Sequence, residues 1–224
     1  MIGGFDESIT SDDVVPQRRD SVGLVGGAFG DTPVGSDIAQ SLNGVHTGWY
    51  LSRSTGLVAY FLSWLSTFAG LMITGRQAQQ WPGVFQANDI HRQASLASVI
   101  MMSIHITVLL LDGYIGYTWQ SLFIPSPNGP YLPFAVALGQ IAFPLIVVVT
   151  VTAEWRSTIG KAWRWIHAAA FFTFFAGALH GILAGSDTRV SMISLMYVLT
   201  ISSTLFMTAY RVFFRTPLKA TGTA

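Results

Sequence analysis

Four histidines lie in parts of the sequence that are long and apolar enough to cross a membrane: His91, His105, His167 and His180. Ionisable side chains are costly inside a bilayer and mark functional sites by default. The first two are 14 residues apart and the last two are 13 apart, which corresponds to about 20 Å along a helix axis. The fifth histidine, His46, comes before the first apolar segment, and we interpret it as an interfacial residue.

These histidines fall into two levels, because the second and fourth apolar segments must cross the membrane in the same direction. His91 and His167 come near the start of their segments, and His105 and His180 come about two-thirds of the way across. Two imidazoles facing each other across a helical bundle suit the axial ligation of a haem iron. The pattern therefore predicts two stacked haem b groups.

The spacing raises a question about the fourth segment. On an ideal helix, a residue 14 positions further along lies within ~40° of the same face. A residue 13 positions further along lies ~220° around the helix axis. We therefore expect this helix to be overwound or bent near Gly177, or its two haems to lie against different faces.

Other readings of the histidines are possible. Membrane histidines can act as buried polar contacts between helices. A zinc or di-iron site is disfavoured, since carboxylates are nearly absent from the apolar segments and the two levels are far apart. The chain has no cysteine, which excludes disulfides, iron–sulfur clusters, thiolate zinc sites and covalently attached haem.

The apolar segments themselves predict an all-α integral membrane protein, a five-helix transmembrane bundle. A span needs about 20 apolar residues, and the expected helices are 49–74, 89–111, 134–154, 163–184 and 190–214. Four prolines make 113–133 a loop, and Pro144 should kink the third helix. Residues 1–48 are acidic and glycine-rich and are expected to be disordered, 49–214 form the haem-binding domain, and 215–224 form a short C-terminal tail.

The composition supports this class. Apolar residues make up 51% of the 224 and charged residues 10%, with a net charge of +1, against about 25% charged in a soluble domain. This excludes a soluble enzyme or a disordered regulator, and it gives no sign of a nucleic-acid partner. The chain is expected to be in contact with membrane lipid.

Orientation follows from the basic residues. Eight lie on one side of the predicted bundle: Arg76, Arg92, Arg156, Lys161, Arg164, Arg211, Arg215 and Lys219. Four lie on the other: Arg18, Arg19, Arg53 and Arg189. We therefore expect a multi-pass protein of the cell (inner) membrane, with its N-terminus outside and its C-terminus in the cytoplasm.

Several short motifs accompany the histidines: RSTGLVAY (53–60), HR (91–92), LLLDGY (109–114), WRWIH (163–167) and HGILAGSDT (180–188). With these motifs the chain resembles, over roughly 49–189, the ferric-reductase-like transmembrane domain family. That family includes the membrane parts of ferric reductases and NADPH oxidases and the haem-binding subunit of a periplasmic methionine sulfoxide reductase system. The resemblance implies transmembrane electron transfer through bis-histidine b-type haems, with His91 and His167 holding the inner haem and His105 and His180 the outer one.

The sequence departs from that family in two respects. Many members have six helices where five are expected here, and no glycine-rich dinucleotide fingerprint follows Phe214. We therefore expect an oxidoreductase component without its own flavin or NADPH domain, which needs a separate electron-donor protein or a quinol and an extracytoplasmic acceptor. Whether the chain is itself an enzyme stays open.

Four arginines are placed to bind haem propionates, because guanidinium matches carboxylate geometry. Arg92 and Arg164 lie beside the inner ligands, and Arg53 and Arg189 lie at the outer end. The alternative is that they only set topology or reach lipid headgroups. Asp112 is expected to cap a turn or to contact a proton or substrate.

Two other functions fit the same sequence. One is a quinol-oxidising membrane-anchor cytochrome b of a respiratory complex, such as the gamma subunit of nitrate reductase. The other is a haem-free structural subunit of a larger membrane complex. A quinone effect on haem reduction would favour the first, and an absorbance spectrum would separate the second.

Overall fold

The computed structural model describes residues 47–112, 117–129 and 131–213, and within these ranges the chain is helical with no strand. Five helical segments are long and apolar enough to cross a membrane, as the sequence predicts. They contain α2 (Thr47–Thr74), α3 (Val84–Leu111), α5 (Pro133–Thr152), α7 (Trp163–Ala184) and α8 (Ser191–Phe213). The chain is therefore compatible with a multi-pass membrane protein.

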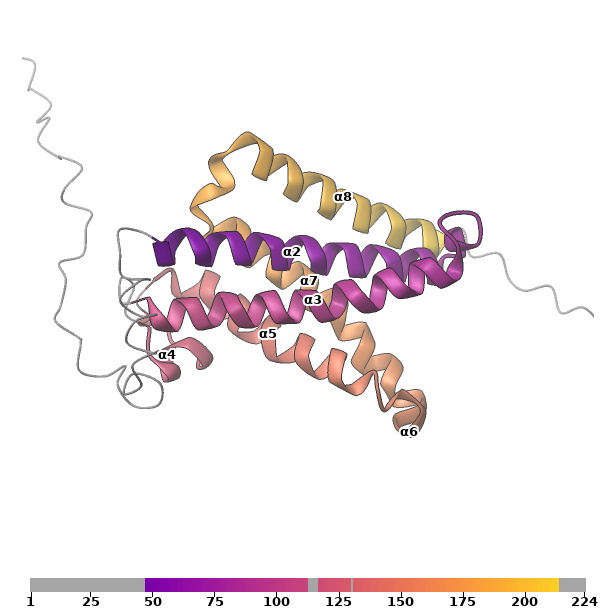
Figure 1. Cartoon of the computed structure of the whole chain (residues 1–224), viewed down its shortest axis with the longest axis horizontal. Coiled ribbons are helices and arrows are strands. Elements are labelled where there is room, and N and C mark those ends of the chain that lie inside the picture. Colours follow the sequence, from indigo (N-terminus) through magenta and orange to yellow (C-terminus); the bar gives the residue numbers. More distant parts are fainter. Residues whose placement is uncertain (1–46, 113–116, 130, 214–224) are drawn as a thin grey trace, which may run out of the picture.

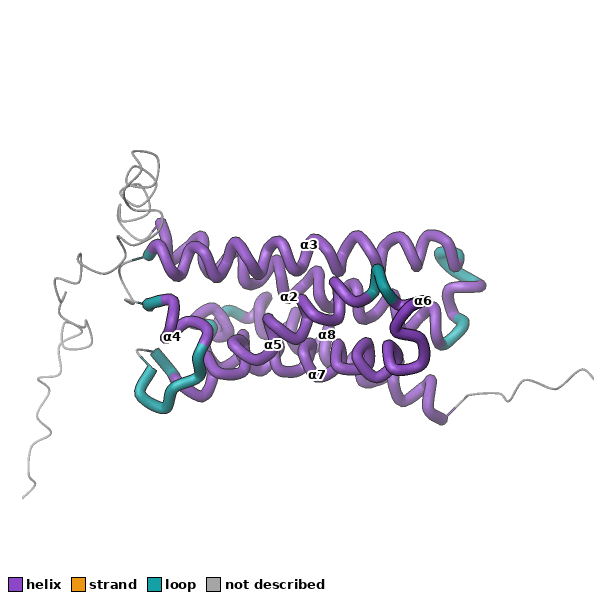
Figure 2. The backbone as a smooth tube through the Cα atoms, turned by 90° about the horizontal axis from the view of Figure 1, so that it is seen from below, coloured by secondary structure: helices purple, strands orange, loops and turns teal. Residues whose placement is uncertain are grey.

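The five long helices run side by side in alternating directions (Figure 2). The most extensive packing is between α2 and α3, which form one antiparallel pair, and the next is between α5 and α7, which form the other. Helix α8 lies along α2 (Figure 1) and touches α7. This arrangement brings α3 and α7, the two histidine-bearing helices, into the same bundle.

The short elements gather at the two ends of the bundle. At one end η1 (Gln77–Gln79) joins α2 to α3, and α6 (Arg156–Ile159) with η2 (Gly160–Ala162) joins α5 to α7. At the other end lie α4 (Trp119–Phe123) and η3 (Ser186–Arg189), the latter between α7 and α8 (Figure 1).

The basic side chains of the described residues divide unequally between these ends. Six belong by their place in the elements to the end with η1 and α6: Arg76, Arg92, Arg156, Lys161, Arg164 and Arg211. Arg53 and Arg189 belong to the end with α4. The uneven distribution seen in the sequence is thus kept in the fold.

A small polar and aromatic core fixes α8 to α2 and α7. Tyr60 stacks on Phe174 with ring centroids 5.8 Å apart and contacts Tyr197 at 4.7 Å. Its hydroxyl forms a hydrogen bond of 2.5 Å with Thr200. Phe174 is 1% exposed, so this aromatic side chain of α7 serves packing.

The structure also corrects the expected boundaries. Helix α3 begins at Val84 rather than 89, and α2 begins at Thr47, inside the expected tail. The expected loop 113–133 contains a short helix, α4, whose first turn is capped by reciprocal hydrogen bonds between Thr118 and Ser121. The two hydroxyls cap the start of α4. The sequence analysis assigned this segment to a loop because of its prolines. The rest of the tail, His46 and residues 214–224 lie outside the described residues.

Candidate functional site: two histidine pairs

The fold brings the four membrane histidines together as two pairs. The outer pair is His105 of α3 and His180 of α7, with ring centroids 6.5 Å apart and ring planes at 76°. The inner pair is His91 of α3 and His167 of α7, with centroids 5.8 Å apart and planes at 82°. The two-level arrangement predicted from the sequence is therefore present.

The two histidines of α3 are oriented by the backbone of α2. His105 Nδ1 lies 2.8 Å from the carbonyl oxygen of Ser52, and His91 Nδ1 lies 2.8 Å from that of Ser66. A carbonyl oxygen can only accept, so each Nδ1 carries the hydrogen and donates it. Each Nε2 is then left with a lone pair, which is the form of imidazole that binds a metal.

His180 is oriented in the same way by α5. Its Nδ1 donates to the carbonyl oxygen of Ala135 over 2.8 Å. The outer pair is therefore held from both sides of the bundle, with α2 supporting His105 and α5 supporting His180. Hydrogen bonds from the non-ligating ring nitrogen to a carbonyl are the usual support of metal-binding histidines.

A glycine lies beside each of these three rings. Gly56, Gly70 and Gly139 face His105, His91 and His180, and an added Cβ would lie 3.2, 3.3 and 3.1 Å from the ring nitrogen Nδ1. In every case the glycine comes four residues after the carbonyl that accepts the hydrogen bond. We call this combination of a carbonyl and a glycine four residues later the carbonyl–glycine contact.

His167 lacks this contact. Its Nδ1 is buried and has no hydrogen-bond partner among the described residues. The ring instead stacks on Trp163 of its own helix, with centroids 4.6 Å apart and planes at 20°. Three histidines are thus oriented by a neighbouring helix, and the fourth is oriented by an aromatic side chain one turn earlier.

The two histidines of α7 flank one face of the helix. Cavity-lining residues of α7 form a continuous stripe that includes Ala170, Phe174, Gly177 and Gly181. On an ideal helix His180 lies on one side of this stripe and His167 on the other, ~140° apart. Because α7 is one continuous helix, this ideal geometry favours the expectation that the two haems lie against different faces.

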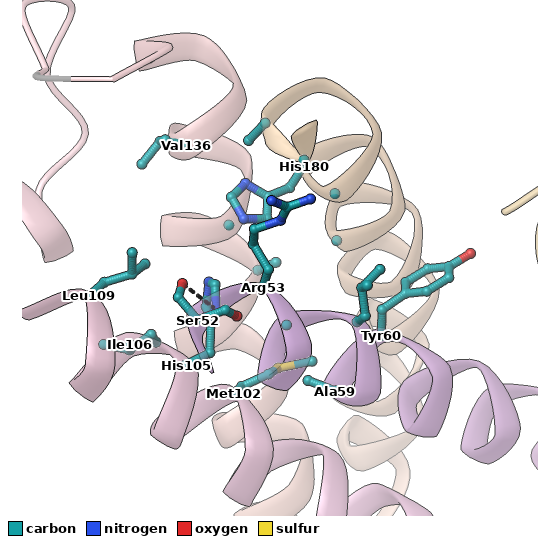
Figure 3. A pocket seen from close by; sticks show the side chains of 18 of the residues that line it. Ser52, Arg53, Ala59, Tyr60, Met102, His105, Ile106, Leu109, Val136 and His180 are labelled. Carbon is teal, nitrogen blue, oxygen red and sulfur yellow. Dashed lines mark hydrogen bonds between the residues drawn. The ribbon is translucent and has the colours of Figure 1, made fainter. Parts of the chain in front are cut away.

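Each pair opens on a cavity. The outer cavity, of about 220 Å³, is lined by His105 and His180 together with Arg53, Asp112 and Asp187. Figure 3 shows His105 beside Ser52, and His180 across the cavity on α7. The aromatic rings of Tyr60, Tyr117, Phe143 and Tyr131 form much of its wall. Burial, aided by nearby Tyr131, raises the pKa of Tyr117 to about 12, so this phenol stays protonated.

The inner cavity is smaller, about 90 Å³, and is lined by His91, His167 and Arg211. Its other walls are rich in small hydroxyl side chains: Ser63, Ser66, Thr67, Thr74, Ser95 and Ser98. Ser63 and Ile146 line both cavities. The two cavities are therefore adjacent and share these two side chains in their walls.

The structure places only one of the four expected propionate arginines at a cavity. Arg53 lines the outer cavity, where its Nε donates to Asp187 Oδ2 over 2.5 Å and a second nitrogen contacts Oδ1. Arg92 is exposed and lies 3.9 Å from Glu154. Arg164 and Arg189 are exposed and line neither cavity.

Several site residues were missed by the sequence analysis. Arg211 lines the inner cavity although it is 44 residues from His167 in the chain. The glycines could have been found, because Ser52–Gly56 and Ser66–Gly70 repeat at the same 14-residue spacing as His91 and His105. Asp112 ends α3, as expected, and is buried against Gly48.

The described residues contain no cluster of three or more histidine, cysteine or acidic side chains that could hold a metal ion. A zinc or di-iron site needs such a cluster. An axial pair does not, because the porphyrin supplies the other four ligands of a haem iron. The histidine pairs therefore fit haem better than a bare metal ion.

The chain belongs to a family defined by a domain of unknown function, DUF8596, whose model matches residues 47–187. The match covers both histidine pairs, four of the five long helices and Asp187. No curated protein and no solved structure matches the chain. The resemblance to the ferric-reductase-like family stays a prediction.

Proposed function

We propose that this member of the DUF8596 family binds two b-type haems and carries electrons across the membrane between them. His105 and His180 would hold the outer haem, and His91 and His167 the inner one. The observation that carries the proposal is the orientation of the rings: three of the four donate Nδ1–H to a backbone carbonyl and keep Nε2 for a metal.

The distance within each pair agrees with this role. Two imidazoles on opposite sides of one metal, with metal–nitrogen bonds of ~2 Å, have ring centres roughly 6 Å apart. The centroid distances are 5.8 and 6.5 Å. The hydroxyls of Ser52 and Ser66 also lie 3.3 and 3.1 Å from Nδ1 of His105 and His91, but a role as polar contacts between helices does not require the two rings of each pair to face each other at this spacing.

A haem with two protein ligands supplies an iron that changes charge by one electron and has no open coordination position. The protein would hold the rings in place, exclude water and set the local charge. The carbonyl–glycine contacts fix three rings, and the apolar walls of the outer cavity exclude water. Such sites suit electron transfer better than the binding of oxygen or of a substrate to iron.

Charged residues at the two cavities support the binding of propionates. Arg53 can present its guanidinium to a carboxylate at the outer cavity, in exchange for part of its contact with Asp187. Arg211 can do the same at the inner cavity. Arginine is suited to this role because its planar fork pairs with a carboxylate through two hydrogen bonds.

The basic residues support an orientation with the η1 and α6 end in the cytoplasm. The inner pair would then lie toward the cytoplasm and the outer pair toward the outside. A donor protein or a quinol would supply electrons at one face, and an acceptor would take them at the other. Co-purification of a partner separates action within a larger membrane complex from action alone.

A quinol-oxidising membrane anchor is the second candidate, and the size of the outer cavity favours it. Beyond the histidines this cavity reaches Asp112, Tyr117 and Tyr131 near the end of the bundle. An aromatic wall with a few polar groups is typical of small-molecule sites. Reduction of the outer haem by a short-chain quinol, abolished by a quinone-site inhibitor, would establish this variant of the function.

The experiment that tests the proposal is a haem determination on the purified full-length protein and on a matched series of variants. Wild type should hold two non-covalent haems per chain. His105→Ala and His180→Ala should each lose one, and Ser103→Ala, a hydroxyl on α3 outside both cavities, should lose neither. Wild type without haem would refute the proposal.

A further inference from the structure

The two histidine pairs differ in how their ligands are supported. Both rings of the outer pair donate Nδ1–H to a carbonyl of a neighbouring helix. In the inner pair His91 does so.

The Nδ1 of His167 is left without a partner among the described residues. Its ring is held instead by stacking on Trp163 of the same helix.

The charges of the two linings differ as well. The described residues that line the outer cavity include two carboxylates, Asp112 and Asp187, and one guanidinium, Arg53. Those that line the inner cavity include one guanidinium, Arg211, and no carboxylate. The formal charge of the lining is thus negative at the outer pair and positive at the inner pair.

Both differences act on the iron in the same direction. A hydrogen bond from Nδ1–H to a carbonyl makes imidazole a stronger donor, which stabilises the more positive, oxidised iron. A positive lining disfavours the oxidised iron through Coulomb repulsion, and a negative lining favours it. The inner site has one supported ligand and a positive lining, whereas the outer site has two supported ligands and a negative lining.

We infer that the inner site has the higher reduction potential, so that the first electron taken up by the protein resides at the His91–His167 level. This inference rests on the proposed function. We expect the equilibrium to favour the reduced inner site at least tenfold, which corresponds to about 59 mV for one electron.

The test is a mediated redox titration of the purified holoprotein, followed by absorbance. Wild type should give two one-electron waves, and His105→Ala should lose the wave of lower potential. Two milder charge variants, which keep every histidine, assign the waves independently. Asp187→Asn removes a negative charge from the lining of the outer cavity and should raise only the low-potential wave.

Arg211→Gln should lower only the high-potential wave, and Arg156→Gln, an exposed arginine at the same end of the bundle, should leave both waves unchanged. Loss of the high-potential wave in His105→Ala would overturn the inference and show that the apolar lining of the outer cavity outweighs its charge. A shift of the high-potential wave in Asp187→Asn, or of the low-potential wave in Arg211→Gln, would overturn it too. If two haems are present but the outer one has the higher reduction potential, only this inference is refuted. If the protein contains no haem, the proposed function is refuted as well.

Discussion

Replacing Gly139 by alanine should weaken the outer haem site and leave the inner one intact. The new Cβ would lie 3.1 Å from Cε1 and Nδ1 of His180 and 3.2 Å from Cγ. The ring must move away by a few tenths of an ångström, while its Nδ1 is held 2.8 Å from the carbonyl of Ala135 on the same helix. The substitution therefore strains the contact that orients the ligand.

The expected loss is 10- to 100-fold in haem affinity at this site, the usual effect of disturbing a group that supports a metal ligand. This equals about 1.4–2.7 kcal/mol. The fold itself should not suffer, since alanine in a helix is more favourable than glycine by about 1 kcal/mol. Loss of haem could then not be explained by unfolding.

The matched control is Gly70→Ala, which places a Cβ 3.3 Å from the ring of His91. This variant should weaken the inner haem and spare the outer one. Both proteins are titrated with haem after extraction, or challenged with an excess of a haem-scavenging apoprotein, and the remaining haem per chain is measured. Equal retention in wild type and Gly139→Ala, or equal loss of both haems in either variant, would refute the reasoning.

Three further predictions concern ligation, charge and topology. His105→Ala and His180→Ala should remove the same haem, seen as the same missing component of the reduced-minus-oxidised spectrum; two different missing components would contradict the pairing. Arg53→Gln leaves the charge of Asp187 at the outer cavity and should lower the outer potential, whereas Asp187→Asn should raise it; shifts of the same sign would argue against a direct charge effect. A cytoplasm-specific fluorescent reporter at the C-terminus should be bright, and a phosphatase inserted in 113–133 should be active; the opposite pair of results would exchange the inner and outer assignments.

The sequence was sufficient to predict the five membrane helices and the two histidine levels. Long apolar runs determine where helices can lie in a bilayer, and helix spacing determines which histidines share a level. Neither argument requires knowledge of how the helices pack. This is why the histidine pairs were predicted from spacing alone, whereas the side of α7 used by each histidine was left open.

The supporting residues depend on the register between helices. Gly56 faces His105 and Gly70 faces His91. These contacts can be predicted only when the register between α2 and α3 is known, although the matching 14-residue spacing was visible in the sequence. Arg92 was chosen because it follows His91, but one residue turns a helix by ~100°, and the side chain is exposed. Arg211 reaches the inner cavity from α8 through packing that no local motif indicates.

The central claim is tested most directly by a reduced-minus-oxidised absorbance spectrum of the purified full-length protein, combined with pyridine extraction and haem quantitation per chain. The account predicts the spectrum of a low-spin b-type cytochrome and two extractable haems per chain, falling to none when His91 and His105 are both replaced by alanine. A protein that contains no haem, or one that retains its haem without these two histidines, would contradict it.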